Sequence, residues 1–97
     1  MQRVNDKDLD NFLAACKGNS FDKLQEQVNN IYAEGYSVIQ FIKQLLDKVI
    51  TMTDISDIQK AKITIKMAEV DSCLVEGASE LLQLLDLGSY LLQVFCK

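Results

Sequence analysis

The chain has no histidine and no proline, and its 97 residues include only four glycines and three cysteines. The absence of histidine excludes Cys₂His₂ zinc sites, Ser-His-Asp triads and Cys–His nucleophiles. The absence of proline, together with glycines that occur singly, favours helices joined by short turns that end at glycine.

Sequence signatures of membrane, secreted and nucleotide-binding proteins are also missing. No apolar run approaches the ~20 residues of a membrane-spanning helix, and residues 1–10 lack the apolar segment of a signal peptide. Neither a Gly-x₄-Gly-Lys-Ser/Thr phosphate loop nor a Gly-x-Gly-x-x-Gly turn is present. Asp6, Asp8 and Asp10 are spaced like calcium ligands, but the glycine and distal glutamate of a calcium loop are absent. We therefore expect no catalytic, cofactor-binding or metal-binding residue in this chain, and no membrane partner.

The charge pattern argues against direct binding of DNA or RNA. The net charge is −4, and the densest positive group is Lys60, Lys62 and Lys66, with Glu69 and Asp71 close behind. A nucleic-acid-binding face needs clustered cations that displace the counter-ions of the phosphates. A solvated helix face is the simpler interpretation of these lysines.

The cysteines, Cys16, Cys73 and Cys96, are odd in number and show no pairwise spacing. Without a secretory signal, this pattern predicts reduced thiols in a cytosolic or nuclear protein. Cys16 and Cys73 stand among apolar residues, where cysteine behaves as a small hydrophobic side chain.

Apolar residues recur with helical spacing along the whole chain, which predicts an all-α fold, a compact five-helix bundle in a single domain. The expected helices cover residues 6–17, 21–34, 38–51, 57–76 and 80–95. Ser56 and Gln59 have the spacing of a capping box at the start of the fourth helix. The first three helices are one-sided; in the third, the polar face comprises Lys43, Gln44, Asp47 and Lys48.

The fourth and fifth helices carry more apolar surface than one core needs. Between Leu81 and Cys96, apolar residues sweep an arc of roughly 200°, about twice the width of a one-sided stripe. The fourth helix has two apolar stripes roughly 180° apart. The first comprises Ile58, Ala61, Ile65, Ala68 and Val75, and the second Ile63, Met67, Val70 and Leu74.

The helical phase does not decide which stripe faces the core. Our hypothesis assigns the second stripe, together with one flank of the fifth helix, to a protein interface. The expected partner-binding residues are Ile63, Met67, Val70, Leu74, Leu84, Leu87, Leu91 and Phe95. Charged residues at Met67 and Val70 are then expected to weaken assembly without unfolding the domain.

Several longer runs resemble one family. The runs are Ala14-Ala15-Cys16, Gly18 to Leu24, Glu34-Gly35-Tyr36, Ser56 to Lys60, Ala68 to Leu74, Glu76-Gly77-Ala78 and Leu82-Gln83-Leu84. Together they resemble the C-terminal collar domain of the small subunits of replication factor C, and among these the eukaryotic subunit 4 group. The resemblance covers nearly all of the chain, although no single run is diagnostic.

The resemblance implies a non-catalytic oligomerisation domain. Such subunits carry two AAA+ ATPase domains before the collar, and five collars form the ring of a clamp loader, which places the sliding clamp on primed DNA during replication and repair. The chain then resembles a piece of a longer nuclear protein whose ATPase module, with its ATP and Mg²⁺, is missing. Its expected partners are sibling collars, whereas clamp and DNA are contacted only through the intact complex.

Two other functions are compatible with parts of the pattern. A freestanding helical adaptor could bind an amphipathic partner helix in a groove. An acyl carrier protein is similar at Asp71-Ser72 followed by Leu74, but its modified serine opens a helix, whereas Ser72 falls deep inside the fourth predicted helix.

Overall fold

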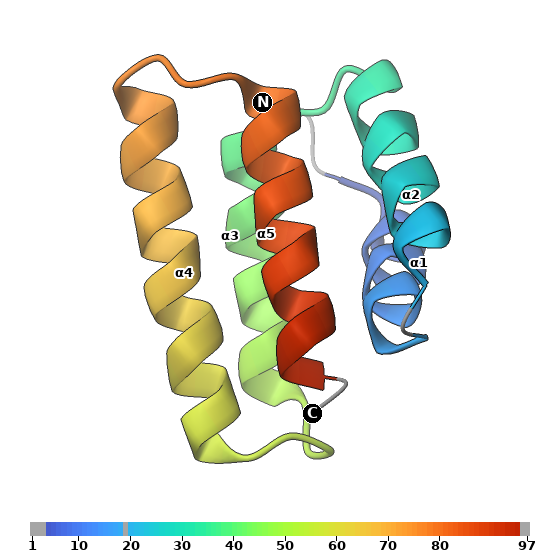
Figure 1. Cartoon of the computed structure of the whole chain (residues 1–97), viewed down its shortest axis with the longest axis vertical. Helices are drawn as coiled ribbons and strands as arrows, with labels where there is room; N and C mark the ends of the chain where they lie inside the picture. Colours follow the sequence, from blue (N-terminus) through green and yellow to red (C-terminus); the bar gives the residue numbers. More distant parts are fainter. Residues whose placement is uncertain (1–3, 19, 96–97) are drawn as a thin grey trace.

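A computed structural model describes residues 4–18 and 20–95 (Figure 1). It contains α1 (Asp6–Lys17), α2 (Phe21–Ala33), α3 (Val38–Thr51), α4 (Asp57–Val75) and α5 (Glu80–Phe95), and the described ranges contain no strand. The predicted all-α fold of five helices is confirmed. None of these helices, within the described ranges, is long and apolar enough to cross a membrane.

Polar side chains at the helix starts explain why the boundaries were predictable. Ser56 Oγ accepts a hydrogen bond from the Gln59 backbone N–H at 3.2 Å, and the Ser56 N–H donates to Gln59 Oε1 at 2.9 Å. This capping box pairs two backbone donors that the helix itself leaves unpaired. Gln59 Nε2 also donates to the carbonyl oxygen of Val94 at 3.0 Å, which ties the start of α4 to the end of α5.

Two glycines end helices in a conformation that side chains disfavour. Gly35 after α2 has φ of 76° and Gly77 after α4 has φ of 97°. Both lie in the left-handed region, where the absence of Cβ removes the steric cost. Gly18 follows α1 but has an ordinary φ of −75°.

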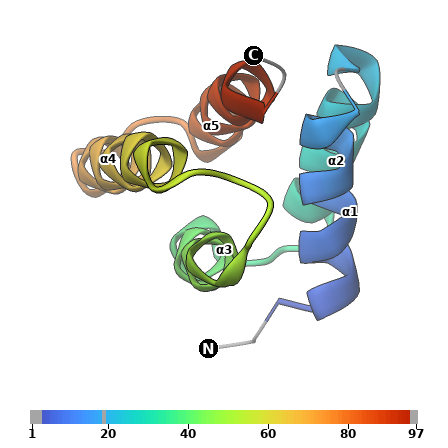
Figure 2. The ribbon, with the colours of Figure 1, turned by 90° about the horizontal axis from the view of Figure 1, so that it is seen from below.

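Helix α5 lies at the centre of the bundle. It packs against α4 on one side and against α1 and α2 on the other, while α3 packs against α4 and α1 (Figures 1 and 2). A helix with neighbours on two sides needs a wide apolar face, so the broad arc of α5 is largely explained within this domain. Helix α4 lies at one edge of the bundle, next to α5 and α3.

The core contains an aromatic ring pair and a buried amide. Phe12 of α1 and Phe41 of α3 meet edge to face, with ring centroids 5.1 Å apart at 84°. Gln44, expected on the polar face of α3, is buried. Its Oε1 accepts from the Val4 N–H at 2.8 Å, and its Nε2 donates to the Val4 carbonyl oxygen at 3.1 Å. The hydrogen bonds that the backbone of Val4 needs explain why a polar residue belongs at this core position.

The crossing of α2 and α5 depends on Gly88. A Cβ at this position would lie 2.6 Å from Leu24 Cδ1 and 3.2 Å from Leu24 Cγ, and Leu24 is fully buried. Cys16 Sγ donates to the carbonyl oxygen of Gly88 at 3.8 Å, so α1 also meets α5 here. The three helices therefore come together at a position where only glycine fits.

We expect Gly88→Ala to destabilise the domain by about 1–2 kcal/mol, because overpacking outweighs the better helix propensity of alanine. Urea unfolding followed by circular dichroism measures this change. In a Leu24→Ala background the added methyl has space, so Gly88→Ala should cost nothing there. An equal cost in both backgrounds would contradict the steric explanation.

Candidate assembly interface

The structure decides which stripe of α4 faces the core. Ile63, Met67 and Val70 are at most 2% exposed, because this side of α4 packs against both α3 and α5. Lysines and acids flank this stripe in the sequence. For example, the long side chain of Lys66 reaches across to Asp86 of α5, with Nζ 2.6 Å from Oδ2.

The predicted partner-binding residues are therefore mostly core residues. The fully buried members are Ile63, Met67, Val70, Leu84, Leu87 and Leu91. Leu74 and Phe95 are partly buried and pack against the same core. Phe95 also lies under the ammonium of Lys17, which is 5.9 Å from its ring centroid. In this structure the six buried side chains have no surface to offer a partner, which corrects the hypothesis based on the sequence.

The other stripe of α4 is the exposed one. Ile58 is 70% exposed, Ile65 61% and Val75 75%, and the alanines and serine between them are exposed as well. We define the outer face of α4 by six residues. They are Ile58, Ala61, Ile65, Ala68, Ser72 and Val75.

The spacing within the outer face is 3, 4, 3, 4 and 3 residues, which is the seam of a helix that packs lengthwise against another helix. Its small members, Ala61, Ala68 and Ser72, would allow a close approach. Other large exposed apolar residues, Phe21, Tyr32, Ile50 and Leu82, lie on other helices. Scattered apolar residues are normal on a surface, whereas an aligned row indicates an interface.

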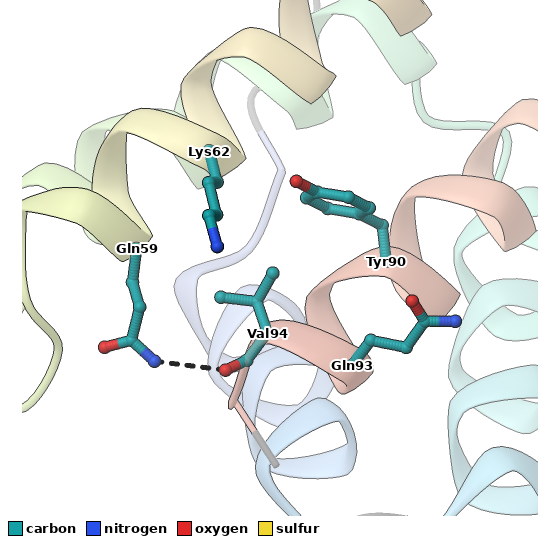
Figure 3. A pocket seen from close by; sticks show the side chains of 5 residues that line it. All are labelled: Gln59, Lys62, Tyr90, Gln93 and Val94. Atoms are coloured by element: carbon teal, nitrogen blue, oxygen red, sulfur yellow. Dashed lines mark hydrogen bonds between the residues drawn. The ribbon is translucent and has the colours of Figure 1, made fainter. Parts of the chain in front are cut away.

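A groove between α4 and α5 runs beside the outer face. Its first hollow, of about 170 Å³, is lined by Gln59, Lys62, Tyr90, Gln93 and Val94 (Figure 3). Its second hollow, of about 200 Å³, shares Lys62 and Tyr90 with the first. The second hollow is completed by Ile65, Lys66 and Glu69. Because Ile65 belongs to both features, the groove and the outer face form one continuous surface.

The two lysines of the groove differ in their surroundings. The Lys66 ammonium is bonded to Asp86 and lies 5.7 Å from the centroid of the Tyr90 ring. The hydrogen bond to Asp86 raises the pKa of Lys66, so it stays charged and fixed to α5. Among residues 4–18 and 20–95, no ion pair or hydrogen bond includes the ammonium of Lys62.

The remaining chemical hypotheses find little support. Ser72 lies well inside α4 rather than at its start, unlike the modified serine of an acyl carrier. The part of the chain that the structure describes contains no group of three His, Cys, Asp or Glu residues that could hold a metal ion. Cys96 lies outside the described residues.

The chain matches the family model described as the replication factor C C-terminal domain over residues 4–90. It belongs to this family. It is 53% identical over 77 residues to replication factor C subunit 2 of Oryza sativa subsp. japonica, covering 79% of this chain and 23% of that protein. It is 45% identical over 85 residues to replication factor C subunit 4 of Homo sapiens, covering 88% and 23%. Replication factor C subunit 4 of Arabidopsis thaliana is 49% identical over 82 residues, covering 84% and 24%.

The resemblance to replication factor C is thereby confirmed. The chain spans about a quarter of the length of the curated relatives it matches. It corresponds to a C-terminal domain of replication factor C, a protein of DNA replication.

Side-chain size is the signal that could have separated the two stripes of α4. The buried stripe contains only isoleucine, methionine, valine and leucine, whereas half of the outer face consists of alanine and serine. Large apolar residues fill a core efficiently, whereas small ones let two helices approach.

A matched pair on α4 tests which side is buried. Met67→Glu should destabilise the isolated chain by about 3 kcal/mol or more, because it removes a core side chain and buries a charge. Ile65→Glu, two residues away and solvent-facing, should change stability by about 1 kcal/mol or less. Urea unfolding compares the two variants, and similar losses in both would contradict the assignment.

Proposed function

We propose that this chain is a non-catalytic assembly domain, and that the outer face of α4 packs against the C-terminal domain of a neighbouring replication factor C subunit. The supporting observation is the row of exposed apolar residues with the spacing of a helix–helix seam, centred on Ile65. Membership of the replication factor C family supports a role in a clamp loader.

The proposed assembly is a pentamer in the nucleus. In it, the C-terminal domains hold the subunits together while ATPase modules in the longer proteins bind ATP and Mg²⁺ and load the sliding clamp onto primed DNA. This domain would contact sibling C-terminal domains, and would reach clamp and DNA only through the complex. The net charge of −4 agrees with a domain that does not itself bind nucleic acid.

The alternative of a freestanding adaptor that binds an amphipathic helix uses the same surface. The family match favours assembly over a freestanding adaptor. In each matched relative, the aligned segment is only about a quarter of a longer protein. The two functions differ in the partner: a sibling domain in one case and an unrelated helix in the other.

Association with sibling domains tests the proposal. The chain is mixed with the C-terminal domains of the other replication factor C subunits of its source organism, and complexes are measured by size exclusion with light scattering and by titration calorimetry. Ile65→Glu should weaken binding to one sibling by at least about tenfold, because it places an unpaired carboxylate in the seam.

Tyr32→Glu is the control, because it also replaces an exposed apolar residue but lies on α2, away from α4 (Figure 1). It should leave the affinity for that sibling unchanged. A chain that binds no sibling, or an equal loss in both variants, would overturn the proposal.

A further inference from the structure

The first hollow of the α4–α5 groove has the size and chemistry of a site for one side chain. Its volume of about 170 Å³ lies below the ~300 Å³ at which pockets for small-molecule ligands begin. In Figure 3, Lys62 of α4 and Tyr90 of α5 point toward one another above Val94, while the side chain of Gln93, also on the lining, points away from them. An aliphatic stem could therefore pack on Val94 while its polar end meets the surrounding groups.

Most of the polar groups around this hollow have no hydrogen-bond partner within the described ranges. The Lys62 ammonium, the Tyr90 hydroxyl and the Gln93 amide make no hydrogen bond within the described ranges, whereas the Gln59 amide is already used by Ser56 and Val94. The ammonium of Lys62 can only donate and favours an anionic acceptor, whereas the hydroxyl of Tyr90 and the amide of Gln93 can donate or accept. The second hollow is lined in part by an acidic residue, Glu69, so an incoming acid is better placed in the first.

Lys62 both lines this hollow and directly follows Ala61 of the outer face. When Ile58, Ala61 and Ile65 are taken as successive seam positions of a helix pair, Lys62 directly follows the second of them. Charged residues that flank a seam in this way face the charged residues of the partner helix, and they determine which helix binds and in which direction.

We propose that Lys62 is a specificity-determining residue that receives an Asp or Glu side chain from the docking helix of the sibling C-terminal domain, in the hollow above Val94. This inference rests on the proposed function, since it needs a helix on the outer face of α4. The carboxylate accepts from Lys62 and Tyr90, and its stem covers Val94. Charge complementarity then adds selectivity to a seam whose apolar residues alone distinguish partners poorly.

Charge variants of Lys62 test this inference in the same binding assay. Lys62→Gln should weaken binding to the sibling by about three- to tenfold, and Lys62→Glu by more, because it adds repulsion. Raising the salt concentration should weaken the wild-type complex more than the Lys62→Gln complex. Lys43→Glu, an exposed lysine on α3, is the matched control and should retain wild-type affinity.

Partner rescue identifies the acid. Each Asp and Glu of the sibling domain is changed to Lys, and one of these variants should restore the binding of Lys62→Glu to within about threefold of wild type. If Ile65→Glu abolishes binding while the Lys62 variants bind normally, or if no acid gives rescue, this inference fails and the proposed function stands. If Ile65→Glu binds normally, both fail. Self-association that Lys62→Glu abolishes would make a second copy of this chain the occupant and would overturn the sibling assignment.

Discussion

The central position of α5 determines how the other helices can pack. A helix that packs against α4 on one side and against α1 and α2 on the other needs apolar residues over most of its circumference. Both α5 and α3 pack against the same side of α4, and this side contains the buried residues Ile63, Met67 and Val70. Since the two stripes of α4 lie on opposite sides of the helix, Ile58, Ile65 and Val75 must then face outward. The outer face of α4 is thus exposed because the opposite side of the helix fills the core.

The helices themselves were predictable from local signals. Ser56 and Gln59 fix the start of α4 through hydrogen bonds within four residues, and the singly spaced glycines mark where α2 and α4 end. Such signals depend only on neighbouring residues, so a single sequence contains them. They place the five helices and the two stripes of α4, but they carry no information about which helices become neighbours.

The orientation of α4 was not predictable in the same way. Ile63 and Ile65 have the same side chain and both stand beside lysines, yet one is fully buried and the other 61% exposed. Their difference depends on α3 and α5 packing against one side of α4, which is a contact between distant segments. Gln44 is a similar case, because in its buried position it pairs the backbone N–H and carbonyl oxygen of Val4, 40 residues away. Burial of this kind depends on tertiary partners rather than on helical phase.

The same arrangement connects stability with the proposed assembly. Gln59 links the start of α4 to Val94, and Lys66 links its middle to Asp86, so the groove beside the outer face is held between two fixed helices. A surface already ordered in this way loses little conformational freedom when a partner binds. A rigid domain can therefore still bind a neighbour through the outer face of α4.

Hydroxyl-radical footprinting of the chain, alone and within the assembled replication factor C complex, measures which side of α4 is buried in the core and which side is covered on assembly. In the free chain, Ile58 and Ile65 should be oxidised while the intrinsically more reactive Met67 is spared by its burial. On assembly, oxidation of Ile58 and Ile65 should fall sharply while that of Tyr32 stays the same. Oxidation of Met67 in the free chain would contradict its burial, and unchanged oxidation of Ile65 in the complex would contradict the proposed interface.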